Sequence, residues 1–421
     1  MSKQLRILIS GSGIAGGASA FWLLRAFPQA RITIVERAPS LRLTGASVDI
    51  RSSAVDVIKW MGLEREIREH TTHEEGMQFV KADGRPVATL RSTGRDDIQS
   101  LTSEYEIFRG ELGRILIEPV LPHVNLIYDE TVEDYEEKED GVAVTFTKSK
   151  ETKTYDLLVA ADGFGSRLRG KMTGCSPREH VVDEGCRVAY WTMEGDLLKG
   201  ERLAKMHTAT GGRCAVIRPD PHPDRRTRAM FLNVLPLNDT ERQDLFETAL
   251  EKGNESYTKL MEETFHDAGW LAPELLEGMR KSDDLYCSWF AQIQCPKLHS
   301  DRVVLVGDAG YATPGIGTSL AIIGGYVLAG ELLSHAGDIP LALRNYQELM
   351  LPFVKSQQGG VGAMQWMAPQ TQWGINVRDR ILSIALGLKM DRVVTYGSAM
   401  LGFTEKKLKM PEYAWPAQCS E

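Results

Sequence analysis

The sequence predicts an α/β protein in which a parallel-sheet domain is interleaved with a mixed β-sheet domain and followed by a C-terminal helical segment. Three observations indicate this architecture. A strand, a Gly-rich turn, a helix and a second strand follow one another over residues 5–36, as in a βαβ unit. From about residue 173 to residue 290 the pattern changes to longer strands with polar loops. Beyond residue 339 it is helical to the end.

Further elements are expected between these regions. Helices are expected at residues 53–61 and 111–121, and a hairpin at residues 77–90 turns at residues 82–85. Strands are expected at residues 124–128, 142–146, 155–161 and 301–308, and a long apolar helix follows the last one. The predicted parallel-sheet domain is therefore discontinuous and comprises residues 1–75, 95–172 and 291–350. Residues 76–94 and 173–290 form the β-sheet domain, and residues 351–421 form the helical segment.

Composition excludes several classes of protein. The chain has 421 residues, of which 43% are hydrophobic and 25% charged, enough for one large or two fused cores. A formal net charge of −8 argues against a protein that coats nucleic acid, which needs clustered Lys and Arg. A small-molecule partner fits better, and the oligomeric state, monomer or homodimer, is left open.

The cysteines and the apolar segments indicate a cytoplasmic protein. Six cysteines are scattered without a CxxC pair or a His spacing for zinc, so no disulfide framework and no metal site is expected. Strand residues begin at Leu5, which leaves no room for a signal peptide. The longest apolar stretch, residues 320–333, contains glycines and is too short to span a bilayer, so no transmembrane segment is expected.

A glycine motif indicates a dinucleotide ligand in the N-terminal unit. Gly11, Gly13 and Gly16 match GxGxxG between a strand and a helix, where they permit a tight turn, close approach of a pyrophosphate and close helix packing. The motif alone is weak, but Glu36 ends the next strand, where a carboxylate can accept both ribose hydroxyls. Because Glu36 would repel a 2′-phosphate, FAD or NAD is favoured over NADP in this slot. A Rossmann-like domain is therefore predicted.

Two further motifs place carboxylates at the carboxyl edge of the same sheet. Residues 160–169 contain the end of a strand at Asp162-Gly163 and then turn into a segment with Ser and two Arg, and residues 304–309 form a buried strand that ends in Gly307-Asp308. Each has a simpler explanation, because Asp-Gly is a common turn and Asp308 can be an ordinary helix cap.

In this order the three motifs resemble the class A FAD-dependent aromatic hydroxylases and monooxygenases, the family of para-hydroxybenzoate hydroxylase and the tetracycline-inactivating monooxygenase. The resemblance covers roughly residues 5–335 and implies a Rossmann-like FAD-binding domain. It implies the following cofactor-binding residues: Gly11, Gly13, Ile14, Ala15, Gly16, Glu36, Arg37, Ala46, Ser47, Arg109, Asp162, Asp308, Gly315, Gly317, Thr318 and Ser319.

The family resemblance also implies a role for each group. The glycines and Glu36 would bind the ADP half of FAD, Arg109 would reach the flavin nucleotide, and residues 45–48 would pass beside the isoalloxazine. A surface ion pair is the alternative for Arg109.

The remaining motifs would serve the other half of the cofactor. By the same resemblance, Asp162 would serve both FAD and NADPH, Asp308 would bind the ribityl chain, and residues 315–319 would hold the flavin ring by backbone groups and helix dipole. The sequence departs from the family at Tyr311, where His is usual, which affects the expected shape of the pocket over the flavin.

The implied activity is that of an FAD-dependent monooxygenase. The sequence has no second GxGxxG unit, so NADPH or NADH is expected to dock transiently near the flavin. Reduced FAD and O2 would form a C4a-hydroperoxide that hydroxylates, or epoxidises, an aromatic or polyketide- or indole-like small molecule. A flavin-dependent halogenase, despite the missing Trp-x-Trp-x-Ile-Pro string, and a non-catalytic binder of the same fold are the alternatives. Rough alignment with the tetracycline enzyme points to Tyr190 and Arg213 as substrate-side residues, although both can equally be packing or surface residues.

Overall fold

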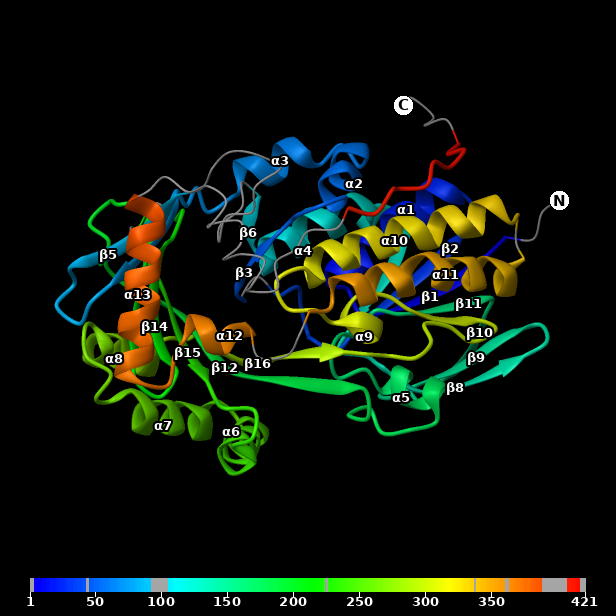
Figure 1. Cartoon of the computed structure of the whole chain (residues 1–421). Helices are drawn as coiled ribbons and strands as arrows, with labels where there is room; N and C mark the ends of the chain where they lie inside the picture. Colours follow the sequence, from blue (N-terminus) through cyan, green and yellow to red (C-terminus); the bar gives the residue numbers. More distant parts are fainter. Residues whose placement is uncertain are drawn as a thin grey trace.

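A parallel sheet forms the centre of one half of the molecule (Figure 1). The computed structural model describes residues 4–42, 45–91, 105–222, 224, 226–336, 338–359, 363–387 and 407–416. The strands lie in the order β17 (Val303–Leu305), β11 (Leu157–Ala160), β1 (Arg6–Ser10), β2 (Arg31–Glu36) and β7 (Val124–Tyr128). All four neighbouring pairs are parallel, so the carboxyl ends of all five strands share one edge.

Helices cover this sheet, and two of them approach each other closely at a glycine. The helices are α1 (Ile14–Ala26), α4 (Arg109–Ile117), α10 (Gly317–Ser334) and α11 (Ile339–Gln357), with α2 (Ala54–Trp60) and α3 (Glu64–Glu69) at the rim. A Cβ at Gly325 of α10 would lie 2.8 Å from the backbone nitrogen of Ser19 in α1. The glycine therefore allows the two helices to approach more closely than side chains permit.

Two smaller sheets complete this half. One is antiparallel and comprises β8 (Val132–Lys138), β9 (Gly141–Phe146) and β10 (Thr152–Tyr155). The other pairs β3 (Ser47–Asp49) with β6 (Glu106–Phe108), also antiparallel.

The second half contains a seven-stranded mixed sheet. Its strands lie in the order β16 (Tyr286–Ile293), β12 (Val181–Met193), β15 (Thr227–Val234), β14 (Arg213–Pro219), β13 (Leu203–Ala209), β4 (Gly76–Val80) and β5 (Pro86–Arg91). Only the β13–β4 pair is parallel. The helices α6 (Thr240–Lys252), α7 (Asn254–Phe265) and α8 (Ala272–Lys281) pack on one face, and α12 (Ala363–Met367) and α13 (Gln372–Gly387) pack on the other. The predicted α/β architecture of a Rossmann-like sheet interleaved with a mixed sheet is confirmed.

Several predicted elements are corrected. The polar loops expected within residues 173–290 include α6, α7 and α8. In α7 the buried Tyr257, Met261 and Phe265 repeat every four residues, which is the spacing of a helical stripe. The helix expected at residues 111–121 starts earlier and ends at Ile117, where a 3-10 helix (Glu118–His123) with Pro119 near its start takes over.

The apolar helix α10 corrects the expectation about membrane spans. By length and composition it is the one helix in the described part of the chain that is long and apolar enough to cross a bilayer, and 78% of its 18-residue window is buried inside the protein. The sequence suggested that this apolar segment is too short to span a bilayer, which is wrong for the helix as a whole. Most of the helix surface is covered by protein.

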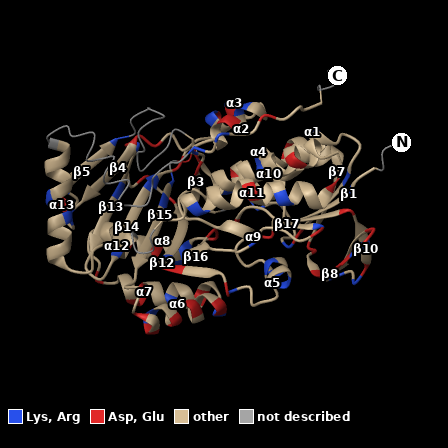
Figure 2. Cartoon of the chain, turned by 45° about the vertical axis from the view of Figure 1, so that its right-hand side comes forward, with Lys and Arg blue, Asp and Glu red and all other residues tan. Residues whose placement is uncertain are grey.

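We propose the division into domains that the sequence suggested, with two adjustments. The predicted boundary at residues 350 and 351 falls inside α11, and the boundary at residues 290 and 291 falls inside β16. Charged residues of both signs are interspersed on the outer helices of both halves, and Figure 2 shows no continuous basic face in that view.

The chain after α13 is not helical where it is described, contrary to the expectation of helix to the end. Residues 407–416 run as an irregular strap across α1 and α10 (Figure 1). The Tyr413 hydroxyl donates to Glu331 Oε1 at 2.7 Å, and the Trp415 ring packs 4.6 Å from the ring of Trp22. The strap therefore covers the outer surface of the buried helix pair.

We expect Gly330→Val to lift this strap, because a Cβ at position 330 would overlap the ring of Tyr413. Overpacking of this kind costs about 1–3 kcal/mol of unfolding free energy. Trypsin should then cut after Lys407 and Lys409 faster than in the wild type, as limited proteolysis with mass spectrometry would show. An unchanged cleavage rate would contradict the packing described.

Candidate active site

The three predicted motifs lie at one edge of the parallel sheet. Gly11 follows β1, Asp162 follows β11 and Asp308 follows β17, while Glu36 ends β2. Backbone hydrogen bonds join these strand ends: Gly11 N donates to Val35 O at 2.8 Å, and Ala161 N donates to Ser10 O at 2.9 Å. Ligands of such sheets bind at this edge.

The three glycines differ in what surrounds them. Gly11 has φ +106°, and a Cβ there would overlap the Ala161 carbonyl, while a Cβ at Gly16 would overlap the Gly11 carbonyl. These two glycines are required by the fold itself. A Cβ at Gly13 would meet nothing within 4 Å. The backbone at Gly13 therefore faces open space at the start of α1, which fits a cradle for a pyrophosphate.

Glu36 is held in place by the glycine turn. Its Oε2 accepts from the backbone nitrogen and hydroxyl of Ser12 at 3.0 and 3.1 Å, and its Oε1 accepts from Ala38 N at 2.9 Å. Burial alone would raise the pKa of Glu36, but these hydrogen bonds outweigh it and hold the pKa below its ordinary value. A carboxylate has about four acceptor positions and three are used, so Glu36 as placed has room for one ribose hydroxyl rather than two.

Asp162 carries an unsatisfied buried atom. Its Oδ1 is buried and has no hydrogen-bond partner among the described residues. Burial raises the pKa of Asp162 to about 6, against an opposing hydrogen bond from Ser166. A buried acceptor without a partner is costly, and a ligand hydroxyl or amide would satisfy it. This observation fits the predicted FAD and nicotinamide site.

Asp308 lies between the starts of two helices. It is the first residue of α9 (Asp308–Tyr311), preceded by Gly307 with φ +65°. A Cβ at Gly307 would lie 2.8 Å from Ala15 Cβ in α1, and a Cβ at Gly317 would lie 3.2 Å from Asp308 Oδ1. The glycine turn, the Asp308 carboxylate and the start of α10 therefore converge, as a single extended ligand requires.

Tyr311, the departure from the family pattern, points into the core. Its hydroxyl lies 3.0 Å from the hydroxyl of Tyr346, which donates to Leu305 O at 3.0 Å. Burial raises the pKa of Tyr311 to about 12. Tyr311 thus fills buried space between α9, α10 and α11.

The other predicted cofactor residues are placed as follows. Arg109 and Arg37 are exposed, and Arg109 N donates to Ala46 O at 3.0 Å, which joins the two predicted flavin segments. Ser319 is buried, and its hydroxyl accepts from Arg51 N at 2.8 Å, a structural role that the sequence did not indicate. The remaining residues lie at the starts of α1 and α10: Ile14 and Ala15 are buried, Thr318 is half-buried, and Gly315 is exposed with φ +80°.

A cavity lies between the β3–β6 pair and the seven-stranded sheet. The empty space between its lining atoms is about 480 Å³, which includes open solvent, and about 30 Å³ of it has room for the centre of a water-sized molecule. One side consists of residues 45–47, the segment predicted to pass beside the isoalloxazine. Large apolar and aromatic side chains form much of the rest: Phe108, Tyr190, Trp191, Met230 and Tyr286. Such a lining suits a flat, apolar molecule.

Of the two predicted substrate-side residues, the structure brings one to this cavity. Tyr190 lines it, and its ring lies 6.3 Å from that of Tyr286 on the neighbouring strand. Arg213 does not line the cavity formed by the described residues. It forms an ion pair with Asp267 and donates to Thr264 O at 2.6 Å.

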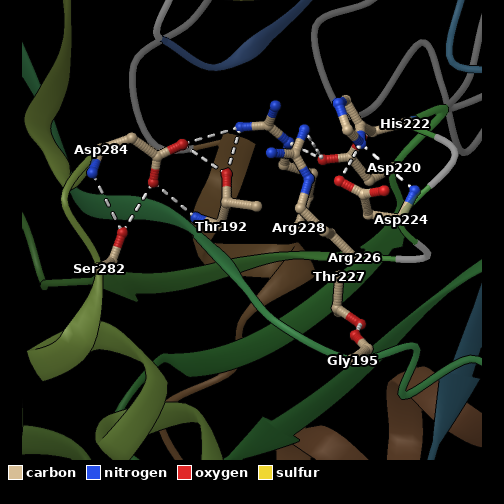
Figure 3. Close-up of polar contacts among 10 residues, drawn as sticks. All are labelled: Thr192, Gly195, Asp220, His222, Asp224, Arg226, Thr227, Arg228, Ser282 and Asp284. Carbon is tan, nitrogen blue, oxygen red and sulfur yellow. Dashed lines mark hydrogen bonds and ion pairs between the residues drawn. The ribbon is translucent and has the colours of Figure 1, made fainter.

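Two arginines that the sequence did not single out also line the cavity. Arg228 forms an ion pair with Asp284 at 3.1 Å and another with Asp220 at 2.8 Å, and its guanidinium lies 4.2 Å from the centre of the Phe108 ring. Figure 3 shows this network, in which Thr192 joins Arg228 to Asp284. The second is Arg218, which contacts two buried glutamates. These residues are far apart in the sequence, so no local motif signals them.

Known proteins resemble this chain over nearly its whole length. A family model described as an FAD binding domain matches residues 4–337. The chain belongs to this family. It is 30% identical over 436 residues to the FAD-dependent monooxygenase asL4 of Sarocladium schorii, with 97% of this chain and 98% of that protein covered. It is 32% identical over 425 residues to the monooxygenase CTB7 of Cercospora beticola, with 98% of each covered.

Solved structures agree with the family. The crystal structure of the tetracycline destructase Tet(51) is similar, with a TM-score of 0.72 and 27% identity over 98% of this chain and 100% of that one. A salicylate hydroxylase, at 20% identity over 96% of this chain and 99% of that one, shares the fold with a TM-score of 0.65. The predicted family, the FAD cofactor and the monooxygenase class are confirmed. The halogenase and non-catalytic alternatives are set aside.

We expect Asp308→Ala to give folded protein that retains little FAD, because the carboxylate is placed to accept a ligand hydroxyl between α1 and α10. Loss of a hydrogen bond to a charged group costs about 1.5–3 kcal/mol, so FAD should bind at least about tenfold more weakly. Flavin absorbance per protein after gel filtration measures this, with the exposed Asp301→Ala as control. Full retention of flavin would show that Asp308 does not contact the cofactor.

Proposed function

We propose that this FAD-dependent monooxygenase takes electrons from NADPH or NADH and places one oxygen atom of O2 on an aromatic, indole- or polyketide-like small molecule, by hydroxylation. The observation that carries the proposal is the cavity: its aromatic wall faces residues 45–47, and Ala46 of that segment is hydrogen-bonded to Arg109. Epoxidation uses the same geometry and is an outcome of the test.

The residues of the chain bind, orient and exclude water. Bound FAD supplies hydride acceptance and oxygen activation, which no side chain provides. The open backbone at Gly13 would hold the pyrophosphate and Asp308 the ribityl chain, while the unsatisfied Asp162 Oδ1 would accept from a cofactor hydroxyl or amide. The aromatic wall with Tyr190 would orient the substrate ring and keep water away from it.

Relatives support the substrate class. The names of asL4 and CTB7 give the reaction class but no substrate. The name of the tetracycline destructase Tet(51) gives tetracycline as its substrate. The present chain covers the whole length of that enzyme at 27% identity. A flat, ring-containing substrate fits both that relative and the cavity wall.

We also propose a cytoplasmic location and a monomer or homodimer. The five described cysteines are free, and Cys186 and Cys214 are fully buried, where burial raises the pKa of each thiol. Cys419 lies outside the described residues. Free buried thiols suit a reducing compartment.

Holoenzyme reconstituted with FAD tests the function. NADPH and NADH oxidation would be followed under air with a panel of phenols, indoles and polycyclic aromatics, and products would be analysed by mass spectrometry after reaction under ¹⁸O2. We expect one compound class to stimulate oxidation and to gain one labelled oxygen. Oxidation that no compound stimulates, with no labelled product, would refute the proposal.

A further inference from the structure

A cysteine and a histidine are in contact on a loop outside the cavity. The loop follows α5 (Arg167–Thr173), which ends at Gly174 with φ +72°, so that Cys175 N donates back to Gly170 O at 3.1 Å. The Cys175 Sγ lies 3.4 Å from His180 Nε2. Both residues are partly exposed, and neither lines the cavity between the two sheets. The pair is therefore a separate site that faces solvent.

The histidine is held from another part of the chain. His180 O accepts from Gln294 N at 2.9 Å, where the start of β12 pairs with the end of β16. The sheet thus fixes the backbone from which the imidazole reaches the sulfur, and the end of α5 fixes the backbone of Cys175. A thiol with an adjacent base is the arrangement that activates a cysteine as a nucleophile.

Thr173 makes a second polar contact to the sulfur. Its Oγ1 lies 3.0 Å from Cys175 Sγ and donates to Arg169 O at 2.8 Å. A hydroxyl carries one proton, so Thr173 accepts from the neutral thiol while it donates to the carbonyl. Once the thiol proton has moved to His180, the hydroxyl can turn and donate to the thiolate. Thr173 therefore serves both protonation states of the sulfur.

A buried cation lies under the same loop. Arg169 is fully buried, its Nη2 donates to Pro177 O at 2.6 Å, and its Nε has no hydrogen-bond partner among the described residues. Burial lowers the pKa of Arg169, and negative charge on Cys295, Asp162 or Cys175 would oppose that effect. The carbonyl end of α5 disfavours a thiolate, but the helix has only 7 residues and contains this cation. A guanidinium with an unused donor thus favours negative charge on the loop.

The other described cysteines lack this environment. Cys186, Cys214 and Cys295 are buried, and burial raises the pKa of each thiol. Cys287 is partly exposed, but burial raises its pKa to about 12, and in the described part of the chain no hydrogen bond links its sulfur to a histidine. A thiol reacts as its thiolate, so these four cysteines are expected to react slowly.

We propose that Cys175 is a modification site at which hydrogen peroxide oxidises the thiol to a sulfenic acid, with His180 as the base. The thiol proton passes to His180 Nε2, and the sulfur attacks one oxygen of the peroxide. An S–O bond forms, the O–O bond breaks, and the departing hydroxide takes the proton from His180 and leaves as water. The sulfur loses two electrons and the peroxide gains them, so one thiol and one H2O2 give one sulfenic acid and one water.

The position of the loop gives the modification a context. A flavoenzyme that activates O2 releases hydrogen peroxide when water enters its site. Arg169 joins the loop of Cys175 to Phe164 O and Ala309 O, which follow the two carboxylate motifs of the predicted flavin site. Cys175 would therefore meet peroxide that the protein itself releases. The oxidation needs neither substrate nor NADPH, so it goes beyond the proposed function and does not depend on it.

Labelling of holoenzyme with hydrogen peroxide tests the site. Because Cys419 lies outside the described residues, every protein in the experiment carries Cys419→Ser. The protein is treated with dilute hydrogen peroxide and dimedone near neutral pH, and the adducts are located by peptide mass spectrometry. We expect the adduct to form on Cys175 at least about tenfold faster than on Cys287.

His180→Gln tests the base. Glutamine keeps a polar side chain on the loop but does not accept a proton, so oxidation of Cys175 should slow by about tenfold or more. His266→Gln is the matched control, because His266 is also near the surface and its Nδ1 also contacts a carbonyl, Glu263 O at 2.9 Å, but its ring contacts no sulfur. This control should react at the wild-type rate.

Alkylation at high pH separates proton transfer from packing. At about pH 10 ordinary thiols are ionised without help from a base, so iodoacetamide should modify Cys175 in His180→Gln within about twofold of the wild-type rate. A loop that is merely disturbed by the substitution would differ from the wild type at both pH values.

Three results would overturn the inference: no adduct on Cys175, equal oxidation of Cys175 and Cys287, or equal oxidation rates near neutral pH in His180→Gln and the wild type. None of them bears on the labelled product expected under ¹⁸O2, so the proposed function and the thiol site stand or fall separately.

Discussion

Replacing Gly13 with valine is expected to give a folded protein that holds no flavin. A side chain at this position meets no protein atom within 4 Å of its Cβ, so the apoprotein accommodates it. The open space is where the glycine turn and the start of α1 would receive a pyrophosphate, so the valine methyl groups would collide with the ligand. The purified variant should be colourless and should release no FAD on denaturation.

Thermal unfolding separates loss of ligand from loss of fold. The apo forms of wild type and Gly13→Val should unfold at the same temperature. Added FAD at about one hundred times its dissociation constant should stabilise only the wild type, by about 2.7 kcal/mol. A Gly13→Val protein that binds FAD as the wild type does would show that the pyrophosphate lies elsewhere.

Gly16→Val is the contrasting control within the same motif. A Cβ at Gly16 would overlap the Gly11 carbonyl, so this variant must separate α1 from β1 even without ligand. Its apoprotein should be destabilised by about 3 kcal/mol or more. The two substitutions are alike in size and lie three residues apart, so their different effects would distinguish a ligand contact from a packing contact.

The sequence predicts those features of the fold that depend on a few neighbouring residues. The glycine turn, the strand that ends in Glu36 and the carboxylates after β11 and β17 are short segments whose meaning depends on the next few residues. A parallel sheet brings its strand ends to one edge, so the convergence of Asp162 and Asp308 follows once the strands are identified.

What the sequence did not predict depends on contacts between distant segments. Arg218 belongs to β14, and its partners Glu74 and Glu106 lie more than a hundred residues earlier in the chain. Arg213, five residues before Arg218, was singled out instead, but its own partner is Asp267. The helices α6–α8 were missed for a different reason: they bury one narrow stripe each, and the polar residues around that stripe resemble loops.

Arg169→Met is expected to destabilise the protein by about 3 kcal/mol or more, the largest effect on stability that we anticipate from a single side chain, because each buried acceptor left without a donor costs about 1–3 kcal/mol. Arg169 lies in α5 (Arg167–Thr173) and is fully buried. Its Nη1 donates to Ala309 O at 2.9 Å, and its Nη2 donates to Phe164 O at 2.9 Å and to Pro177 O at 2.6 Å. Methionine would fill similar space but leave three buried carbonyls without donors.

The same guanidinium joins two parts of the flavin site. Phe164 follows the Asp162-Gly163 turn, and Ala309 follows Asp308, so Arg169 fixes the distance between the two carboxylates. We therefore expect Arg169→Met to bind FAD more weakly even at temperatures where it is folded, as isothermal titration of the apoprotein would show. Arg167→Met is the control, because Arg167 starts the same helix but is exposed, and its loss should cost less than about 0.5 kcal/mol.

A loss of stability without a change in FAD affinity would mean that Arg169 supports only the core. A loss of both stability and FAD affinity, with Arg167→Met unaffected, would mean that the Asp162-Gly163 motif and the Gly307-Asp308 motif hold the cofactor as one unit. Their spacing along the chain, more than a hundred residues, is then bridged by a single buried cation that contacts backbone carbonyls on both sides.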